Sequence, residues 1–181
     1  TLRHLALAAV SACSVTAFSP ALAQDATFVL NSREAGAPTY NPIKGTKLNI
    51  ANNLIFDRMV MQDADQSFHG QLAESWQASP DGMSWTFKLR RGVKFHDGSA
   101  FNAQAVVWNY EKILNDKAEQ YDPKQAAQGR GRIPTVKSVK ALDDLTVEFT
   151  TTEVDALLPF KIVWIVMSSP AQWNAVGKSW D

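Results

Sequence analysis

An alternation of apolar and polar positions is clearest near the middle of the chain. In residues 84–90, SWTFKLR, every second side chain is a tryptophan, phenylalanine or leucine. A period of two is typical of a strand that buries one face. The run WQAS precedes it across a turn in which Pro80 presets φ and Gly82 accepts a positive φ. We therefore predict a β-hairpin, and we expect residues 93–95 to continue its second strand.

A helical period of apolar residues follows this hairpin. Apolar side chains recur on one face of residues 103–114, and Asn102 before them is a favourable N-cap. Phe101 and Val106 stand at the two positions of a hydrophobic staple. The pattern predicts an amphipathic helix over these residues. The polar residues 115–132 have no apolar period, and we expect them to form a loop.

The last third of the chain predicts a second hairpin. Residues 136–151 form two alternating runs around a turn at residues 143–144. The side chains expected to face the core are Val139, Leu142, Val147 and Phe149. Residues 155–160 predict a short helix, and the apolar residues 161–167 predict a buried strand or the wall of a cleft.

Three more elements are expected upstream of the first hairpin. Residues 26–31 are rich in strand-forming side chains and predict the first strand. Residues 47–56 carry apolar side chains at a spacing compatible with one helical face. Residues 58–62 predict a second strand.

The beginning of the chain resembles an export signal. Arg3 precedes an apolar run over residues 5–18, and the small-x-small pattern Ala-Leu-Ala ends at Ala23. The apolar run is shorter than the roughly 20 residues that a membrane-spanning helix needs. We expect cleavage after Ala23, so that residues 1–23 are a signal peptide and the protein is exported. A lipoprotein tether at Cys13 is the alternative, because VSAC resembles a lipobox.

Both ends of the chain suggest a piece of a longer protein. Residue 1 is threonine rather than methionine, and the chain stops in the middle of a pattern at VGKSWD. We therefore expect further sequence to follow Asp181.

Charge and composition exclude one class of partner. The 181 residues include 18 basic and 18 acidic side chains, so the formal net charge is zero. A dedicated nucleic-acid-binding protein needs a basic face that displaces counterions from phosphates. The short run GRGR at residues 129–132 does not supply such a face, and we expect no nucleic-acid partner.

No motif predicts catalysis, a metal site or a cofactor. His96 and Asp97 are explained by a turn at Asp97-Gly98, and His69 and His96, the histidines left after cleavage, do not make a metal cluster. The run GKS near the end lacks the first glycine of a phosphate-binding loop, because Gln172 occupies that position. We therefore expect no catalytic residue, no metal and no cofactor, and a protein that is not an enzyme.

Aromatic residues are the more informative candidates. The chain contains six tryptophans, of which Trp85 and Trp108 lie within apolar patterns and are expected in the core. Trp164 and Tyr121 have no such assignment. We expect Tyr121 and Trp164 to be ligand-binding residues that stack against a bound molecule.

One long segment resembles a known family. Residues 72–114 have the sequence LAESWQASPDGMSWTFKLRRGVKFHDGSAFNAQAVVWNYEKIL. It resembles the signature region of the family 5 extracellular solute-binding proteins, the dipeptide-, oligopeptide- and nickel-binding components of ABC importers. Residues 30–42, LNSREAGAPTYNP, are similar to the first strand and loop of the family. Glu34 matches the family pattern there, whereas Ala35 and Tyr40 depart from it.

The resemblance implies a fold and a division of the chain. It implies an α/β, periplasmic binding protein-like fold of two lobes joined by a hinge, with an extra inserted subdomain. Residues 24–45 would then begin lobe I, residues 46–165 would form the inserted subdomain, and residues 166–181 would return to lobe I. Lobe II would be absent.

The resemblance also implies a function. The protein is expected to capture peptides or similar small oligo-compounds in the periplasm and to deliver them to an ABC permease in the inner membrane. It is expected to act as a monomer. Glu34, by its motif, and Tyr40, by its position, are expected ligand contacts. The alternatives are a nickel-chelate, opine or glycoside binder of the same family, or an exported hydrolase.

Overall fold

The computed structural model describes residues 55–179, all of which fall within the compact unit Ser32–Asp181. The expected signal peptide, the strand predicted at residues 26–31 and most of the helix predicted at residues 47–56 lie outside the described residues. Glu34 and Tyr40 lie outside them too. Among the described helices, none is both long and apolar enough to span a membrane.

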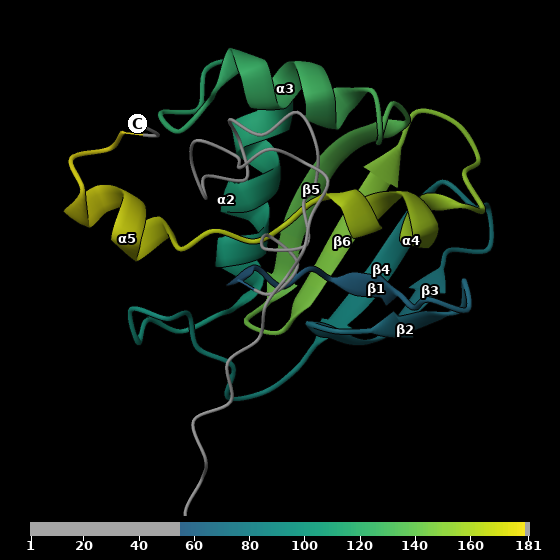
Figure 1. Ribbon diagram of the computed structural model, residues 1–181. Helices are drawn as coiled ribbons and strands as arrows, with labels where there is room; N and C mark the ends of the chain where they lie inside the picture. Colours follow the sequence, from purple (N-terminus) through teal and green to yellow (C-terminus); the bar gives the residue numbers. More distant parts are fainter. Residues whose placement is uncertain (1–54, 180–181) are drawn as a thin grey trace, which may run out of the picture. The chain divides into compact units, whose positions relative to one another are not determined.

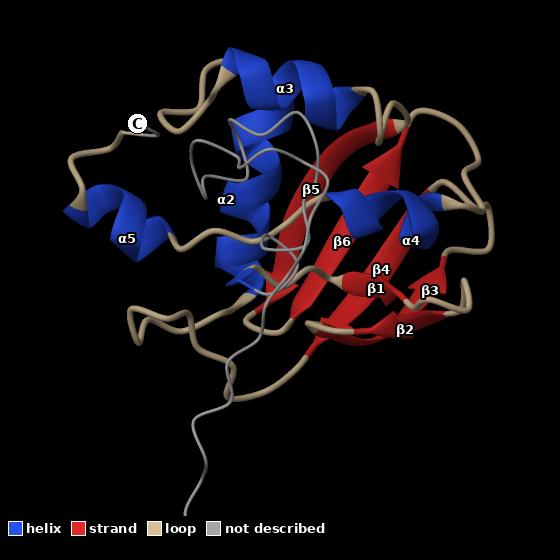
Figure 2. Ribbon diagram, in the orientation of Figure 1, coloured by secondary structure: helices blue, strands red, loops and turns tan. Residues whose placement is uncertain are grey.

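A four-stranded antiparallel sheet forms the centre of the described part (Figure 2). Its strand order is β3-β4-β6-β5, with bounds β3 Ala73–Ala78, β4 Ser84–Leu89, β5 Val136–Asp143 and β6 Thr146–Thr151. Both predicted hairpins are therefore confirmed. Gly82 adopts a φ of 69° in the first turn, as its sequence position requires. A separate two-stranded sheet pairs β1 (Val60–Gln62) with β2 (Phe68–Gly70), which confirms a strand near residues 58–62.

The core lies largely between the sheet and helix α2 (Ala103–Leu114), which packs mainly on β5 and lies beside it in Figure 1. The Phe149 ring contacts the Phe87 ring at 5.1 Å between centroids and the Tyr110 ring of α2 at 4.7 Å, edge to face. Both α2 bounds agree with the prediction. The side chain of Asn102 accepts a hydrogen bond from the Ala105 N–H at 3.0 Å and caps the helix as expected.

The continuation of β4 through residues 93–95 was predicted wrongly. Gly92 takes a φ of 72° and redirects the chain, so residues 93–100 form a narrow loop. The loop is closed by an isolated bridge between Lys94 and Ala100 and by a turn in which Gly98 takes a φ of 83°. Gly92 thus turns the chain away from the strand that the apolar residues alone would have prolonged, and Gly98 turns it back.

A helix stands where residues 115–132 predicted only a loop. Helix α3 (Pro123–Arg130) begins with proline at a position where no N–H is needed, and Asp122 accepts a hydrogen bond from the Gln125 N–H at 2.8 Å. Its packing uses the small residues Ala126 and Gly129 rather than an apolar stripe. Capping and close packing stabilise this helix, and its sequence therefore lacks the hydrophobic period that would have predicted it.

The second hairpin contains one misassigned residue. Val139, Val147 and Phe149 are buried as predicted, but Leu142 is 55% exposed. The register of β5 against β6 shifts between Ala141 and Asp143, which is the signature of a β-bulge. An extra residue in one strand turns Leu142 away from the core.

The segment after β6 is partly buried and contains no regular strand. The predicted helix at residues 155–160 is displaced to α4 (Leu158–Lys161), because the Asp155 carboxylate accepts hydrogen bonds from Leu157, Thr135 and Lys161 and holds the preceding residues in a turn. Residues 161–167, predicted as a strand or cleft wall, continue as the 3₁₀ turn η1 (Ile162–Trp164) and an extended stretch. Helix α5 (Pro170–Ala175) follows.

The approach of α3 to α2 yields a test of this packing. A Cβ atom at Gly129 would lie 2.8 Å from the Ile113 Cγ2 methyl, whereas one at Gly131 would meet no atom closer than 3.7 Å. Both glycines end the same helix with negative φ, so the entropic gain from alanine is similar at both sites. G129A is expected to lower the free energy of unfolding by about 1–2 kcal/mol relative to G131A, measured by urea denaturation. Equal stability of the two variants would contradict the close packing.

Candidate functional site

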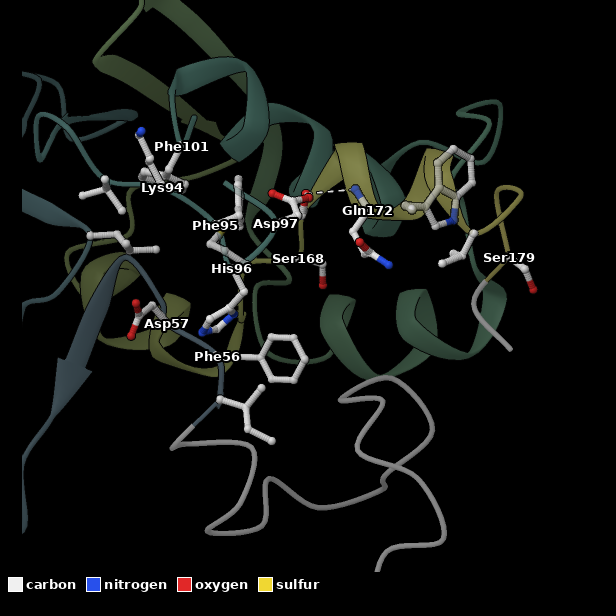
Figure 3. A pocket seen from close by; sticks show the side chains of 17 residues that line it. Phe56, Asp57, Lys94, Phe95, His96, Asp97, Phe101, Ser168, Gln172 and Ser179 are labelled. Carbon is white, nitrogen blue, oxygen red and sulfur yellow. Dashed lines mark hydrogen bonds between the residues drawn. The ribbon is translucent and has the colours of Figure 1, made fainter. Parts of the chain in front are cut away.

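A half-open cavity of about 520 Å³ lies beside helix α5 (Figure 3). Four short stretches form most of its lining, namely residues 55–57, residues 93–97, residues 167–169 and one side of α5 with the residues after it, and Leu72 and Phe101 complete it. These stretches are far apart in sequence. The sheet and α2 bring them together, and none of them belongs to the sheet itself.

The walls of the cavity are largely apolar. Phe95 and Phe101 meet edge to face with 5.7 Å between ring centroids, and both line the cavity. Met167 and Trp173 are buried side chains of the opposite wall. The loop after β4 therefore contributes aromatic surface to the cavity, although the sequence predicted a strand there.

A few polar side chains point into this apolar space. Asp57 lies at one end of the cavity and Ser179 at the other in Figure 3. His96 and Gln172 stand between them, as does the Ser168 side chain. An apolar cleft with a small number of convergent polar groups is the usual form of a small-molecule site.

The His-Asp-Gly turn fastens the loop to the start of α5. The Asp97 carboxylate accepts hydrogen bonds from the Ser99 N–H at 2.8 Å, from the Ser99 hydroxyl and, at 2.5 Å, from the Ser169 hydroxyl. Ser169 is the N-cap of α5 and accepts a hydrogen bond from the Gln172 N–H at 3.1 Å. Hydrogen bonds from Ser169, then Ser99, lower the pKa of Asp97 to about 2.

Helix α2 holds the same wall from the other side. The Asn109 amide donates to the Ser168 carbonyl at 2.8 Å and accepts from the Ser168 N–H at 2.9 Å. The rings of Trp108 on α2 and Trp173 on α5 meet edge to face at 5.6 Å. The wall formed by residues 167–176 is thus tied both to the loop and to α2.

Of the residues expected to bind a ligand, the two that the structure describes, Trp164 and Tyr121, do not line this cavity. Trp164 is 44% exposed, and the guanidinium of Arg132 lies 4.1 Å from the centroid of its ring. Tyr121 is half-buried in the loop between α2 and α3. Neither Trp164 nor Tyr121 belongs to the cavity lining.

Sequence reasoning missed the loop at residues 93–97 and the first turn of α5. The expected turn at Asp97-Gly98 is correct, but its carboxylate also joins the loop to α5. Trp85 and Trp108, expected in the core, are half-buried, and Trp85 Nε1 donates to the Asp155 carbonyl at 2.9 Å. Among residues 55–179, no three histidine, cysteine, aspartate or glutamate side chains are grouped so as to hold a metal ion.

Comparison with known proteins assigns the family. The model of the bacterial extracellular solute-binding proteins, family 5 Middle, matches residues 67–181, which is more than half of the chain. The chain belongs to this family. The match begins just before β2 and includes both hairpins, α2 and α5.

Individual family 5 relatives match across most of the chain. It is 31% identical over 179 residues to the glutathione-binding protein GsiB of Pectobacterium atrosepticum, which covers 97% of this chain and 33% of that protein. It is 28% identical over 157 residues to the dipeptide-binding protein of Escherichia coli, with coverage of 79% and 29%. The chain spans about a third of the length of these curated relatives. Both carry names of binding proteins rather than of enzymes.

A solved structure with a similar fold is NikA from Brucella suis in complex with Fe(III)-EDTA. It is 29% identical, with a TM-score of 0.58 and coverage of 67% of this chain and 24% of that one. A dipeptide-binding protein of Pseudoalteromonas sp. SM9913, solved with Met-Leu, has a TM-score of 0.66 at 24% identity and coverage of 80% and 32%. These likenesses confirm the expected α/β class and its periplasmic binding protein type.

The tie between the loop and α5 can be tested by titration. A carboxyl group whose charged form accepts hydrogen bonds has a lowered pKa, and Ser169 is the largest contributor to that of Asp97. In full-length protein, carbon-detected NMR is expected to give a pKa of about 2 for Asp97. S169A should raise this pKa toward the ordinary 3.8, and by more than S99A does. An unchanged pKa in S169A would show that Asp97 does not hold the α5 cap.

Proposed function

We propose that this chain is part of a substrate-binding component of an ABC-type importer. The protein would capture peptides or similar small compounds in the periplasm and deliver them to a permease in the inner membrane. Membership in family 5 supports this function. We also propose that the protein is a monomer, that it binds no nucleic acid and that it catalyses no reaction.

The cavity beside α5 is the observation that carries the proposal to particular residues. Its volume of about 520 Å³ lies within the range of about 300–1,000 Å³ that is usual for small-molecule sites. The Phe95 and Phe101 rings offer apolar contact to a side chain. Asp57, His96 and Gln172 offer polar groups that orient a ligand. We assign ligand contact to these groups.

The mechanism requires capture rather than chemistry. In a two-lobe binding protein, the ligand contacts both lobes and stabilises the closed form by its higher affinity for that form. The described residues would supply one side of the enclosure. The fixed position of the α5 wall, tied to both the loop and α2, favours such a role because a preorganised surface loses little entropy on binding.

A second surface remains part of the proposal. Trp164, exposed beneath the Arg132 guanidinium, offers a flat aromatic face next to a cation. We propose Trp164 as a ligand contact at that surface and Tyr121 as a contact from the loop between α2 and α3. We propose Glu34 and Tyr40 as contacts from the segment outside the described residues.

A metal chelate is the second candidate ligand. The observation that favours it is the similarity to a structure solved with Fe(III)-EDTA at 29% identity. A chelate would bring its own ligands, so it would need apolar and hydrogen-bonding contacts from the protein rather than a metal cluster.

Ligand titration of the full-length protein tests the proposed function. Melting temperature and calorimetry are measured with dipeptides, glutathione, nickel–histidine and an opine. A ligand at 100 times its dissociation constant is expected to stabilise the protein by about 2.7 kcal/mol. Hydrolysis of an ester or peptide substrate with no shift in melting temperature for any ligand would contradict it.

Two valine substitutions locate the site. Val176 lines the cavity and Val154 does not, and both side chains are exposed, so tryptophan is tolerated at either position. V176W is expected to weaken binding at least tenfold by filling the cavity, whereas V154W should leave it unchanged. Binding that is lost in W164A but kept in V176W would move the site to the Trp164 surface.

A further inference from the structure

A buried lysine lies behind the α5 wall of the cavity. Lys112 on α2 is 3% exposed, and its ammonium donates to the Asn109 side-chain oxygen at 2.9 Å. Its Nζ also lies 3.5 Å from the Ser168 hydroxyl oxygen. The same Asn109 oxygen accepts the Ser168 N–H. Lys112 therefore shares its hydrogen-bond acceptor with the backbone of the cavity wall.

This cluster sits where the wall has no regular secondary structure. Residues 167–169 belong to no strand or helix, yet they carry Met167 and Ser168 into the cavity and Ser169 onto the start of α5. A change in the cluster therefore shifts lining residues directly. Because α5 begins at Pro170, directly after these residues, the helix moves with them.

The charges around Lys112 are unevenly distributed. The carboxylate of Asp122, the N-cap of α3, attracts its ammonium, and on α2 the Trp108 ring lies 6.0 Å from Nζ. Residues 167–175, MSSPAQWNA, contain no ionisable side chain. Burial is the larger effect and lowers the pKa of Lys112 to about 7.

We propose that Lys112 is a positioning residue whose proton determines how firmly residues 167–169, and with them α5, close the side of the cavity. The proposal rests on the proposed function for what the wall encloses. It adds a proton-dependent control of that enclosure. Opening of the wall exposes Lys112 to water, whereas local opening elsewhere in the protein does not.

The direction of the effect follows from linkage. In the closed wall the pKa of Lys112 is about 7, and in an open, hydrated wall it returns toward 10.5. Between these values the open form binds more protons, so the closed form gains stability as pH rises and loses it as pH falls. The opening equilibrium should grow about ninefold from pH 9 to pH 8, and by less than about twofold from pH 7 to pH 6.

Amide exchange of the full-length protein measures this opening directly. The Ser168 N–H is the reporter, because its hydrogen bond to Asn109 breaks when the wall opens. After correction for intrinsic exchange, its opening constant in the wild type should follow the ninefold change. The Asp63 N–H, bonded to the Ser67 carbonyl in the distant β1–β2 turn, should not follow it.

Two lysine substitutions provide the matched comparison. K112M keeps the length of the side chain without its charge, and its Ser168 opening constant is expected to be independent of pH. K117M removes an exposed lysine just after α2 and should behave as the wild type does. A flat wild-type profile, or the same pH dependence in K112M, would overturn the proposal.

Two further outcomes separate the possible failures. If the Ser168 and Phe87 amides exchange with the same opening constant, only global unfolding exposes Lys112, and the wall is not a separate moving element. A dipeptide that binds the wild type while the Ser168 profile is flat would refute the control by Lys112 and leave the proposed function standing. A proton-dependent Ser168 profile without binding of any ligand would support the control by Lys112 and contradict the proposed function.

Discussion

The paired hydrogen bonds between the Asn109 amide and the backbone of Ser168 are the constraint on which the site depends. Residues 167–169 lie in no strand, so the peptide groups there need partners from elsewhere. A fully buried asparagine supplies an acceptor and a donor to the same residue, at 2.9 and 2.8 Å. Leaving either group unpaired in the core would cost about 1–3 kcal/mol. This cost fixes the wall against α2.

The position of the wall then determines the cavity. With Ser168 fixed by Asn109, Ser169 meets the Asp97 carboxylate and caps α5. Trp173 comes to rest against Trp108. The loop and α5 therefore face one another because both are tied to Ser169.

Local patterns identified the elements whose causes are local. The alternation around Phe87 predicted the first hairpin, and Asn102 predicted the start of α2, because strand period and helix capping act over a few residues. The bulge that exposes Leu142 and the packing of Gly129 on Ile113 depend on partners distant in sequence. No pattern within residues 115–132 or 136–151 contains that information.

The candidate site was harder to predict for the same reason. His96 and Asp97 were assigned to a turn, which is correct, but only the fold places Ser169 within 2.5 Å of Asp97. Asn109 looked like any polar residue of an amphipathic helix, although it is fully buried. The family resemblance, by contrast, was visible in residues 72–114, and the match over residues 67–181 confirms it.

A crystal structure of the full-length protein with a bound dipeptide tests the central claim most directly. The account predicts ligand density bounded by residues 55–57, the loop at residues 93–97 and α5, in contact with Phe95 and His96. Density at another surface, with the cavity beside α5 filled by the protein's own side chains, would contradict it.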